Sequence, residues 1–546
     1  MLYDNKIDGF FNSYVGNNSK FVYAKFSNLA LRAAKANKKV KIIALNKTTL
    51  AKEGELKLAG YPQNKNTGDM RFFKIVALEN VVYVVWTKEE KNTVDVYLET
   101  YDPTLKKISN LKKVYSLKDD RKKSEKLVLV SNNKAGSIIM IGKELGVEEK
   151  EEVLKFEYNI ISENLNVKSS GLVELPIIVR RNNVGSDPLS GPAVSYELGD
   201  NGKIYITDYI KRDKKDLKKG EATTYPIIVQ ISPESGKSKS FNVRFDNKNT
   251  FRFSTLITTD GVALYGFFCD LDKDPKGNDT HGIFYVSMDE NEFKIKASKF
   301  SYFDKSFLDQ LYAGDKEDQR KSFKLNKDKK KSDEESIDSR YVIESVQQEG
   351  KDIILFCSMM YNWSQTVCSR SSNGVQSCQT YYYCDKSNVT AFRMSADGGL
   401  VWASNLNRFY SYIGHNIFDV HVLKKDNQYV VLYNDIFRPN TEKQSRKSKE
   451  EVVDGFDYAT FDASNGSFAK KDFRVNAVNT PRKERKVVSS NAVTDLDNTF
   501  YISSTRYSLK PVAFLYCLLG PCGYFGFTSG NMRKGQGYLG SISAAR

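Results

Sequence analysis

Six of the seven cysteines lie in two clusters, and their spacing limits the chemistry that they can do. The clusters are Cys357, Cys368, Cys378 and Cys384, then Cys517 and Cys522, and Cys269 stands apart. Neither cluster contains a C-x-x-C pair or a flanking histidine, so a zinc site is a poor fit. We expect two disulfides in the first cluster and one in the second, which is typical of an oxidising compartment.

Histidine, a common general base, occurs only at His281, His415 and His421. His421 lies in an alternating segment that is typical of a strand. No serine or cysteine nucleophile motif such as G-x-S-x-G accompanies these residues. We therefore assign no catalytic residue, and the sequence contains no motif that calls for a cofactor.

The segment 270–279 has carboxylates at Asp270, Asp272 and Asp274, as calcium-binding loops do. Its glycine, Gly277, falls later than the glycine of an EF-hand loop, and no glutamate closes the coordination. We therefore interpret the segment as a solvated acidic turn and expect no bound metal.

The chain carries 83 Lys and Arg residues against 67 Asp and Glu residues, a net charge of +16. This charge could serve an anionic partner such as nucleic acid, lipid headgroups or an acidic protein, but it also fits a lysine-rich solvated surface, which we favour. The basic runs alternate with acidic residues, and no RNA-binding or helix-turn-helix motif is present. We expect no nucleic-acid partner.

An apolar stretch at residues 511–527 is the strongest candidate for a binding site. It is shorter than the roughly 20 residues of a membrane span, and it is too apolar for an ordinary surface loop. It either folds over the protein and plugs a channel or gap, or forms a disulfide-pinned finger that enters a partner protein or the membrane interface. The candidate partner-binding residues are Phe514, Leu515, Tyr516, Leu518, Leu519, Tyr524, Phe525 and Phe527.

Short β-hairpins must position these residues, because hairpin patterns recur along the whole chain. In the clearest copy, the alternating segments 389–394 and 400–404 flank the turn-forming residues 395–399. Weaker copies start near residues 44, 101, 231 and 461. Aromatic residues, at 12% of the chain, also favour strands.

The same hairpin contains Ser395-x-Asp397-x-Gly399-x-x-Trp402, which resembles the Asp box of sialidase-type propellers. Val401 stands where that pattern has threonine. In that family the box is a structural turn between outer strands and lies far from the catalytic site. The resemblance therefore implies a fold and no activity.

The strand patterns group in fours, with a period of roughly 50 to 70 residues, as the blades of a β-propeller require. We expect an all-β fold, a β-propeller of seven four-stranded blades with eight as the alternative. Strands from both termini would close the ring and hide the exposed strand edges. Residues 1–546 would form a single domain.

In such blades, the turns between second and third strands share one face of the disc with the connections between blades. Nearly all of the long insertions are of these two kinds, including 311–339, 361–383 and 509–535. We expect this face to be elaborated, basic and partly disulfide-tied, while the other face has short turns. Long loops on a rigid scaffold are where binding usually resides.

Residues 1–8 contain no basic segment followed by an apolar run, so no signal peptide is visible. Because the cysteine pattern indicates an oxidising compartment, we expect an exported protein whose leader is absent from this numbering. The expected location is the periplasm or the cell envelope.

The chain resembles the secreted β-propellers of Bacteroidota cell envelopes. The residues that carry the resemblance are the 388–402 hairpin, 261–268, 282–286 and 300–311, and the likeness extends over residues 70–475. Some proteins of this kind, such as the plug subunit of the type 9 secretion translocon, are non-catalytic subunits that dock on outer-membrane barrels. The resemblance implies a monomer within a hetero-complex, whose partner is an outer-membrane or secretion-complex protein.

We hypothesise a non-catalytic protein-binding propeller that docks through long basic and disulfide-tied loops on one face, with residues 511–527 as anchor. The alternative is a propeller hydrolase or lyase that acts on glycans with carboxylates at the central channel. A cluster of acids and arginines in the channel would favour the enzyme, and packed apolar strands would favour the binding protein.

Overall fold

The computed structural model describes residues 5–8, 10–27, 40–58, 70–119, 125–136, 138–145, 151–180, 194–212, 218, 220–258, 261–275, 277, 279–312, 336–338, 341–370, 376–413, 420–433, 455–474, 487–496, 499–509 and 533–543. A helical pattern at residues 29–36 lies outside them.

Seven four-stranded antiparallel sheets, here called blades 1 to 7, follow one another along the chain. Blade 1 contains β2 (Phe10–Asn17), β3 (Phe21–Ser27), β4 (Val40–Asn46) and β5 (Lys52–Leu58). Blade 2 contains β6 (Met70–Ala77), β7 (Val82–Glu89), β8 (Thr93–Tyr101) and β9 (Lys112–Lys118). Blade 3 contains β10 (Lys126–Asn132), β11 (Ile138–Glu144), β12 (Glu151–Ile161) and β13 (Val167–Arg180). Blade 4 contains β14 (Ser195–Leu198), β15 (Ile204–Lys211), β16 (Thr224–Ser232) and β17 (Lys237–Asn242).

The remaining blades keep this order from the innermost to the outermost strand. Blade 5 contains β18 (Lys248–Thr258), β19 (Gly261–Asp270), β21 (Gly282–Asp289) and β22 (Ile295–Tyr302). Blade 6 contains β24 (Tyr341–Glu349), β25 (Asp352–Arg370), β26 (Gln376–Met394) and β27 (Leu400–Ile413). Blade 7 contains β28 (His421–Lys425), β29 (Gln428–Tyr433), β30 (Gly455–Asp462) and β31 (Phe468–Arg474).

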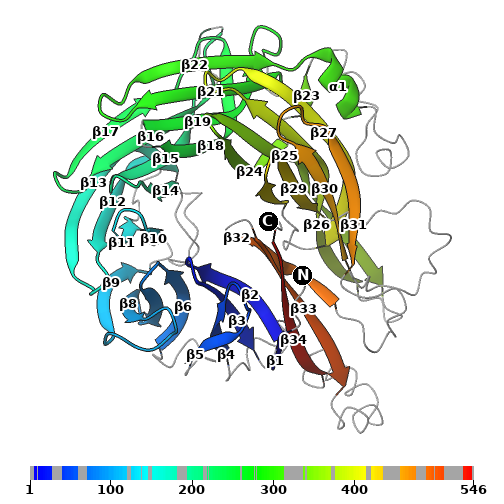
Figure 1. Cartoon of the computed structure of the whole chain (residues 1–546). Coiled ribbons are helices and arrows are strands. Elements are labelled where there is room, and N and C mark those ends of the chain that lie inside the picture. Colours follow the sequence, from blue (N-terminus) through cyan, green and yellow to red (C-terminus); the bar gives the residue numbers. More distant parts are fainter. Residues whose placement is uncertain are drawn as a thin grey trace.

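Both ends of the chain build the sheet that closes the ring. β32 (Val487–Leu496), β33 (Thr499–Leu509) and β34 (Arg533–Ser543) take β1 (Asn5–Asp8) as their fourth strand. β1 pairs antiparallel with β34, from Asn5 opposite Leu539 to Asp8 opposite Gln536. Figure 1 shows the sheets following one another around a ring, with the two termini near each other. The all-β propeller and its closure by both termini are confirmed, and the closing sheet is the eighth, which is the alternative count.

Each blade packs face to face on the next, because its strands carry apolar side chains on both faces of the sheet. Separate clusters of buried apolar side chains join blades 1 and 2, 2 and 3, 3 and 4, 4 and 5, 5 and 6, and 6 and 7. In β3, Phe21 and Tyr23 point toward blade 2. Val22, Ala24 and Phe26 belong to a different cluster and are 0% exposed. The closing sheet lies on this side of blade 1, where β2 contacts β32.

The turns between third and fourth strands repeat one backbone device in blades 1 to 7. One residue in each turn adopts a positive φ, between 54° at Leu50 and 84° at Gly398. The seven residues are Leu50, Leu105, Leu165, Gly236, Phe293, Gly398 and Gly466. A polar residue opens each turn; Asp102 Oδ1, for example, accepts the N–H of Thr104 at 2.8 Å. Such side-chain caps favour a tight reversal.

At several of these turns, the size of the positive-φ side chain fits the space that the neighbouring blade leaves for it. Leu105 packs in the cluster between blades 1 and 2, and Phe293 packs in the cluster between blades 4 and 5. At Gly398 and Gly466, glycine occupies the position because an aromatic ring of the preceding blade already fills the space. A Cβ added at Gly398 would lie 2.5 Å from the Tyr285 ring of blade 5, while one added at Gly236 would meet nothing within 4 Å.

We predict that Gly398→Ala lowers the free energy of unfolding by about 3 kcal/mol, because left-handed strain adds to overpacking against Tyr285. Gly236→Ala, at the same turn position, should cost only about 1 kcal/mol from strain. Urea denaturation of both variants measures the difference. Equal losses would contradict this packing.

Candidate partner-binding face

Two of the long insertions meet beside blades 5 and 6. β20 (Asp279–Thr280) lies between the second and third strands of blade 5, and β23 (Ile337–Asp338) lies between blades 5 and 6. The two pair as a small antiparallel sheet, with Thr280 opposite Ile337. A second-to-third-strand connection and a blade-to-blade connection are therefore neighbours, which supports the expectation that such insertions share one face.

The same region contains α1 (Lys305–Tyr312), which the strand-based reading of the sequence missed. Asp304 caps the helix, because its Oδ1 accepts the N–H of Phe307 at 2.7 Å. Phe307, Leu308 and Leu311 are buried in the cluster between blades 5 and 6. The available signal was an N-cap residue followed by apolar residues at helical spacing. The helix anchors the start of the 311–339 insertion.

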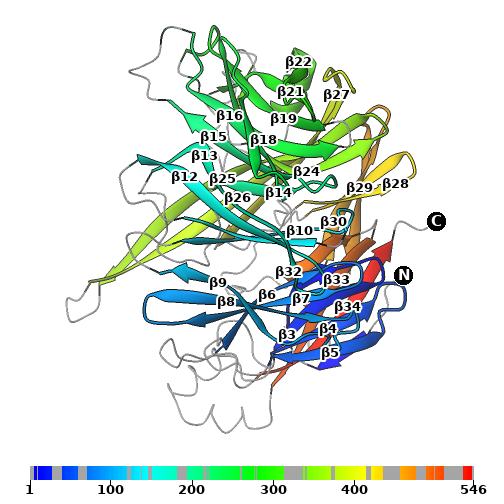
Figure 2. The same cartoon turned by 90° about the vertical axis from the view of Figure 1, so that its left-hand side faces the viewer.

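A two-stranded ribbon, here called the arm, extends blade 6 beyond its neighbours. β25 and β26 are each 19 residues long. β24 pairs with β25 only as far as Met359, and β27 pairs with β26 only as far as Tyr383. Figure 2 shows β25 and β26 reaching well past the rest of the disc. The 361–383 insertion thus begins and ends as a continuation of these two strands.

A disulfide joins the two strands of the arm near its tip. Cys368 and Cys378 stand opposite each other in the strand register and are bonded, with their Cα atoms 4.0 Å apart. Both residues are exposed. On the same ribbon, the exposed hydroxyls of Thr366 and Thr380 lie 3.0 Å apart. These cross-strand links hold the register of a ribbon that has no third strand among the described residues.

Cys357 is a correction to the expected disulfides, because it is a free, fully buried thiol. It lies opposite Thr390, whereas Cys384 lies opposite Asn362, about 16 Å further along β25. A disulfide needs Cα atoms within about 7 Å, so these cysteines cannot bond. Burial raises the pKa of the Cys357 thiol well above its ordinary value.

The other predicted site residues are only partly placed by the structure. Cys269 is free and buried, and burial raises the pKa of its thiol to about 12. Residues 510–532 lie outside the described residues, so the fate of Phe514, Leu515, Tyr516, Leu518, Leu519, Tyr524, Phe525 and Phe527 and of Cys517 and Cys522 stays a prediction.

In the acidic turn of blade 5, Asp270 has structural partners. Its Oδ2 lies 2.7 Å from Lys248 Nζ and accepts the hydroxyl of Tyr302. Its backbone N–H donates to Nδ1 of the buried His281 at 3.2 Å. Among the described residues, no three His, Cys, Asp or Glu side chains converge in a way that could hold a metal ion.

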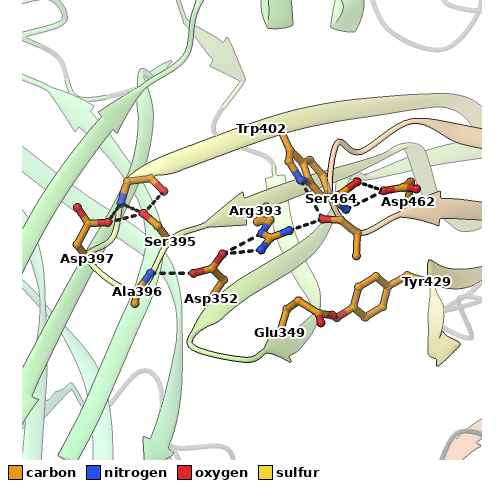
Figure 3. Close-up of polar contacts among 12 residues, drawn as sticks. Glu349, Asp352, Arg393, Ser395, Ala396, Asp397, Trp402, Tyr429, Asp462 and Ser464 are labelled. Atoms are coloured by element: carbon orange, nitrogen blue, oxygen red, sulfur yellow. Dashed lines mark hydrogen bonds and ion pairs between the residues drawn. The ribbon is translucent and has the colours of Figure 1, made fainter. Parts of the chain in front are cut away.

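The Asp-box-like turn joins three blades, and Figure 3 shows its contacts within blade 6 and with blade 7. Ser395 Oγ accepts the N–H of Gly399 at 3.0 Å within the turn. Asp397 pairs with Lys299 of blade 5 at 2.9 Å. Trp402 Nε1 donates to the carbonyl oxygen of Ala463 in blade 7 at 3.2 Å. These contacts give the motif a structural role between β26 and β27.

Arg393, which precedes this turn, completes the junction between blades 6 and 7. It donates to Asp352 Oδ2 at 2.7 Å and to the carbonyl oxygen of Ala463 at 2.7 Å. Between the same two blades, the hydroxyl of Tyr429 in β29 donates to Glu349 in β24 at 2.5 Å. The charged groups of this region, also drawn in Figure 3, therefore hold blades together.

One carboxylate on the innermost strands has the environment expected of an acid-base group. Glu197 of β14 accepts a hydrogen bond from Thr255 Oγ1 of β18 at 2.5 Å. Burial raises the pKa of Glu197, although the Thr255 hydrogen bond opposes this effect. Burial also raises the pKa of Asp208 in β15. Perturbed carboxyls occur at functional sites and in structural networks alike.

Comparisons with known proteins leave the function open. No protein-family model matches the chain, and no curated protein sequence matches it. The WD40 domain of SCAP from fission yeast aligns at 8% identity and a TM-score of 0.36, covering 98% of this chain and 96% of that one. The β-propeller domain of the Trilobed protease from Pyrococcus furiosus aligns at 10% identity and 0.32, covering 88% and 98%. A PL25 ulvan lyase aligns at 9% identity and 0.35, covering 86% and 96%. Similarity at this level says nothing about activity.

We predict that the Glu197 carboxyl makes stability fall as pH rises. Its folded-state pKa lies above the ordinary value of 4.5, so the folded state binds this proton more tightly than the unfolded state does. The unfolding free energy should therefore fall, relative to Glu197→Gln, as pH rises from 4.5 through the folded pKa. Urea denaturation at several pH values measures this, with the exposed Glu234→Gln as control. A constant difference between wild type and Glu197→Gln would contradict it.

Proposed function

We propose that the protein is a non-catalytic, protein-binding propeller of the cell envelope. The observation that supports this proposal is the asymmetry of the disc. The opposite face has short connections, such as the two residues Gly350 and Lys351 between β24 and β25. The arm and the β20–β23 sheet instead occupy connections of the kind that share the elaborated face. A rigid ring that presents nearly all of its long insertions on one face is suited to gripping another protein.

The proposed partner is an outer-membrane or secretion-complex protein, with this chain as a monomer in a hetero-complex. The resemblance to envelope propellers, including the type 9 plug subunit, motivates this choice. The exposed disulfide of the arm is consistent with the periplasm or cell envelope, because such bonds persist in oxidising compartments. No helix in the described part of the chain is long and apolar enough to cross a membrane. Residues 511–527 would supply the apolar anchor, with contact to the partner or the membrane interface.

A glycan-acting hydrolase or lyase is the second candidate, and Glu197 is the observation that favours it. Its raised pKa and its place on an innermost strand would suit a general acid. The known contact of its carboxylate is the Thr255 hydroxyl of the next blade, which gives it a role in holding blades 4 and 5 together. We therefore rank binding above catalysis.

We predict that the triple variant Phe514→Asp, Leu515→Asp and Phe525→Asp loses its partner in native co-purification. Charge placed at an apolar anchor should reduce recovery about tenfold or more, because buried aromatic anchors dominate interface energies. The matched control replaces three exposed apolar residues elsewhere, Ile108, Leu172 and Val401, which are 62%, 60% and 52% exposed, with aspartate. Equal recovery with both triple variants would refute the anchor.

A further inference from the structure

The edge of β25 in the arm is a row of strand positions that has no neighbouring strand in the described structure. β24 pairs with β25 from Asp352 to Met359 and then ends. β25 continues to Arg370, paired on its other side with β26 throughout. The register of β25 with β26 is regular from Met359 onward, so its backbone groups alternate strictly between the two sides.

The disulfide identifies which positions face the open side. The Cα atoms of Cys368 and Cys378 are 4.0 Å apart, the close spacing of a non-hydrogen-bonded antiparallel pair. In such pairs the N–H and C=O groups point away from the partner strand. Because the backbone groups repeat this direction every two residues, they also point away from β26 at Thr366, which lies opposite Thr380, and at Ser364, which lies opposite Tyr382. Ser364 and Thr366 therefore direct their backbone groups to the side that β24 occupies lower in the blade.

This edge lacks the charges that the outer strands of six blades carry. The outer strands β5, β9, β13, β17, β22 and β31 each carry at least two Lys or Arg residues. Charged side chains on an edge strand discourage pairing with another chain. Residues 360–369 of β25 contain no charged residue and no proline, in a chain that is 27% charged. Residues 376–382 of β26, on the opposite edge of the arm, are likewise uncharged, so charge opposes strand addition on neither edge. The β25 edge is the one in line with β24.

We propose that this edge of β25 accepts an extended strand of the partner protein, which continues the blade 6 sheet where β24 ends. The proposal rests on the proposed binding function and specifies its mode as main-chain pairing. The disulfide and the Thr366–Thr380 contact fix the ribbon before binding, so little order is lost when the strand adds. A second copy of this chain is disfavoured as the occupant, because each copy carries a net charge of +16.

Proline substitution tests the edge without breaking the ribbon. Thr366→Pro removes an N–H that points to the open side and leaves the β25–β26 hydrogen bonds in place. Thr380→Pro is the matched control, because it makes the same change directly across the ribbon and also removes the Thr366–Thr380 contact. The probe is the partner that co-purifies with the tagged wild-type chain, which is then eluted and titrated onto each purified full-length variant.

We expect Thr366→Pro to weaken binding about tenfold and Thr380→Pro to leave it within about twofold. In the wild-type complex, the amides of Ser364 and Thr366 should exchange hydrogen at least about tenfold more slowly than in the free chain. This exchange measurement needs no variant, so it decides the question even if Thr366→Pro folds poorly.

Other outcomes overturn the proposal. If Thr366→Pro binds with wild-type affinity and hydrogen exchange at Ser364 and Thr366 is unchanged in the complex, strand addition is refuted. The binding function would still be supported by loss of the partner in the 511–527 variant. Loss of binding in Thr380→Pro alone would place the partner on the edge of β26 and refute pairing with β25. A wild-type dimer in sedimentation that Thr366→Pro abolishes would make a second copy the occupant. Recovery of no partner by the wild-type chain refutes the binding function and this mode together.

Discussion

The two apolar faces of every blade are the constraint on which the structure depends. A four-stranded sheet with alternate apolar residues on both sides can bury them only between two neighbours, and each buried aliphatic or aromatic side chain contributes about 1.5–3 kcal/mol. In blade 1, Tyr23 serves the contact with blade 2, while Val22 and Phe26 on the opposite side are equally buried. Blade 1 can therefore bury this second apolar face only against the closing sheet. β1 completes the closing sheet, and β32 of that sheet contacts β2 of blade 1.

Closure explains why the two faces of the disc differ. The turns between third and fourth strands pack against the preceding blade, so their shape is restricted: Leu105 fills a space there, whereas Gly398 makes room for Tyr285. The connections on the other side carry no such repeated restraint, and they hold α1, the β20–β23 sheet and the arm. Conformational freedom is therefore available on one side of a rigid ring, and this is where a binding surface can be built.

Much of the fold could be predicted because blade strands repeat a short-range pattern. The segments 389–394 and 400–404 were expected as strands and lie in β26 and β27. The arm was interpreted as a loop, although Tyr361, Trp363 and Val367 alternate with polar residues as in a strand. α1 has only eight residues, too few for a helical period to stand out. The positive φ of Leu105 is invisible in sequence because tertiary packing, and not glycine, permits it.

The candidate site was harder to predict than the fold, because nearness in sequence differs from nearness in space. Cys357 and Cys368 belong to one sequence cluster, yet an extended strand separates them by about 36 Å. The pairing of Cys368 with Cys378 became evident only from the register of the arm. The unprotected edge of β25 is likewise a property of where β24 ends, and composition alone does not reveal it.

Hydrogen exchange at β1 in the intact protein tests the central claim, closure of the ring, most directly. If β1 completes the last sheet, the amides of Asn5–Asp8 that face β34 exchange at least about 100-fold more slowly than in an unfolded peptide. Deletion of residues 1–9 should then release the amides of Gln536–Leu539 on β34 as well. Exchange of Asn5–Asp8 at the unfolded rate, with no change in β34 on deletion, would contradict a ring closed by its two ends.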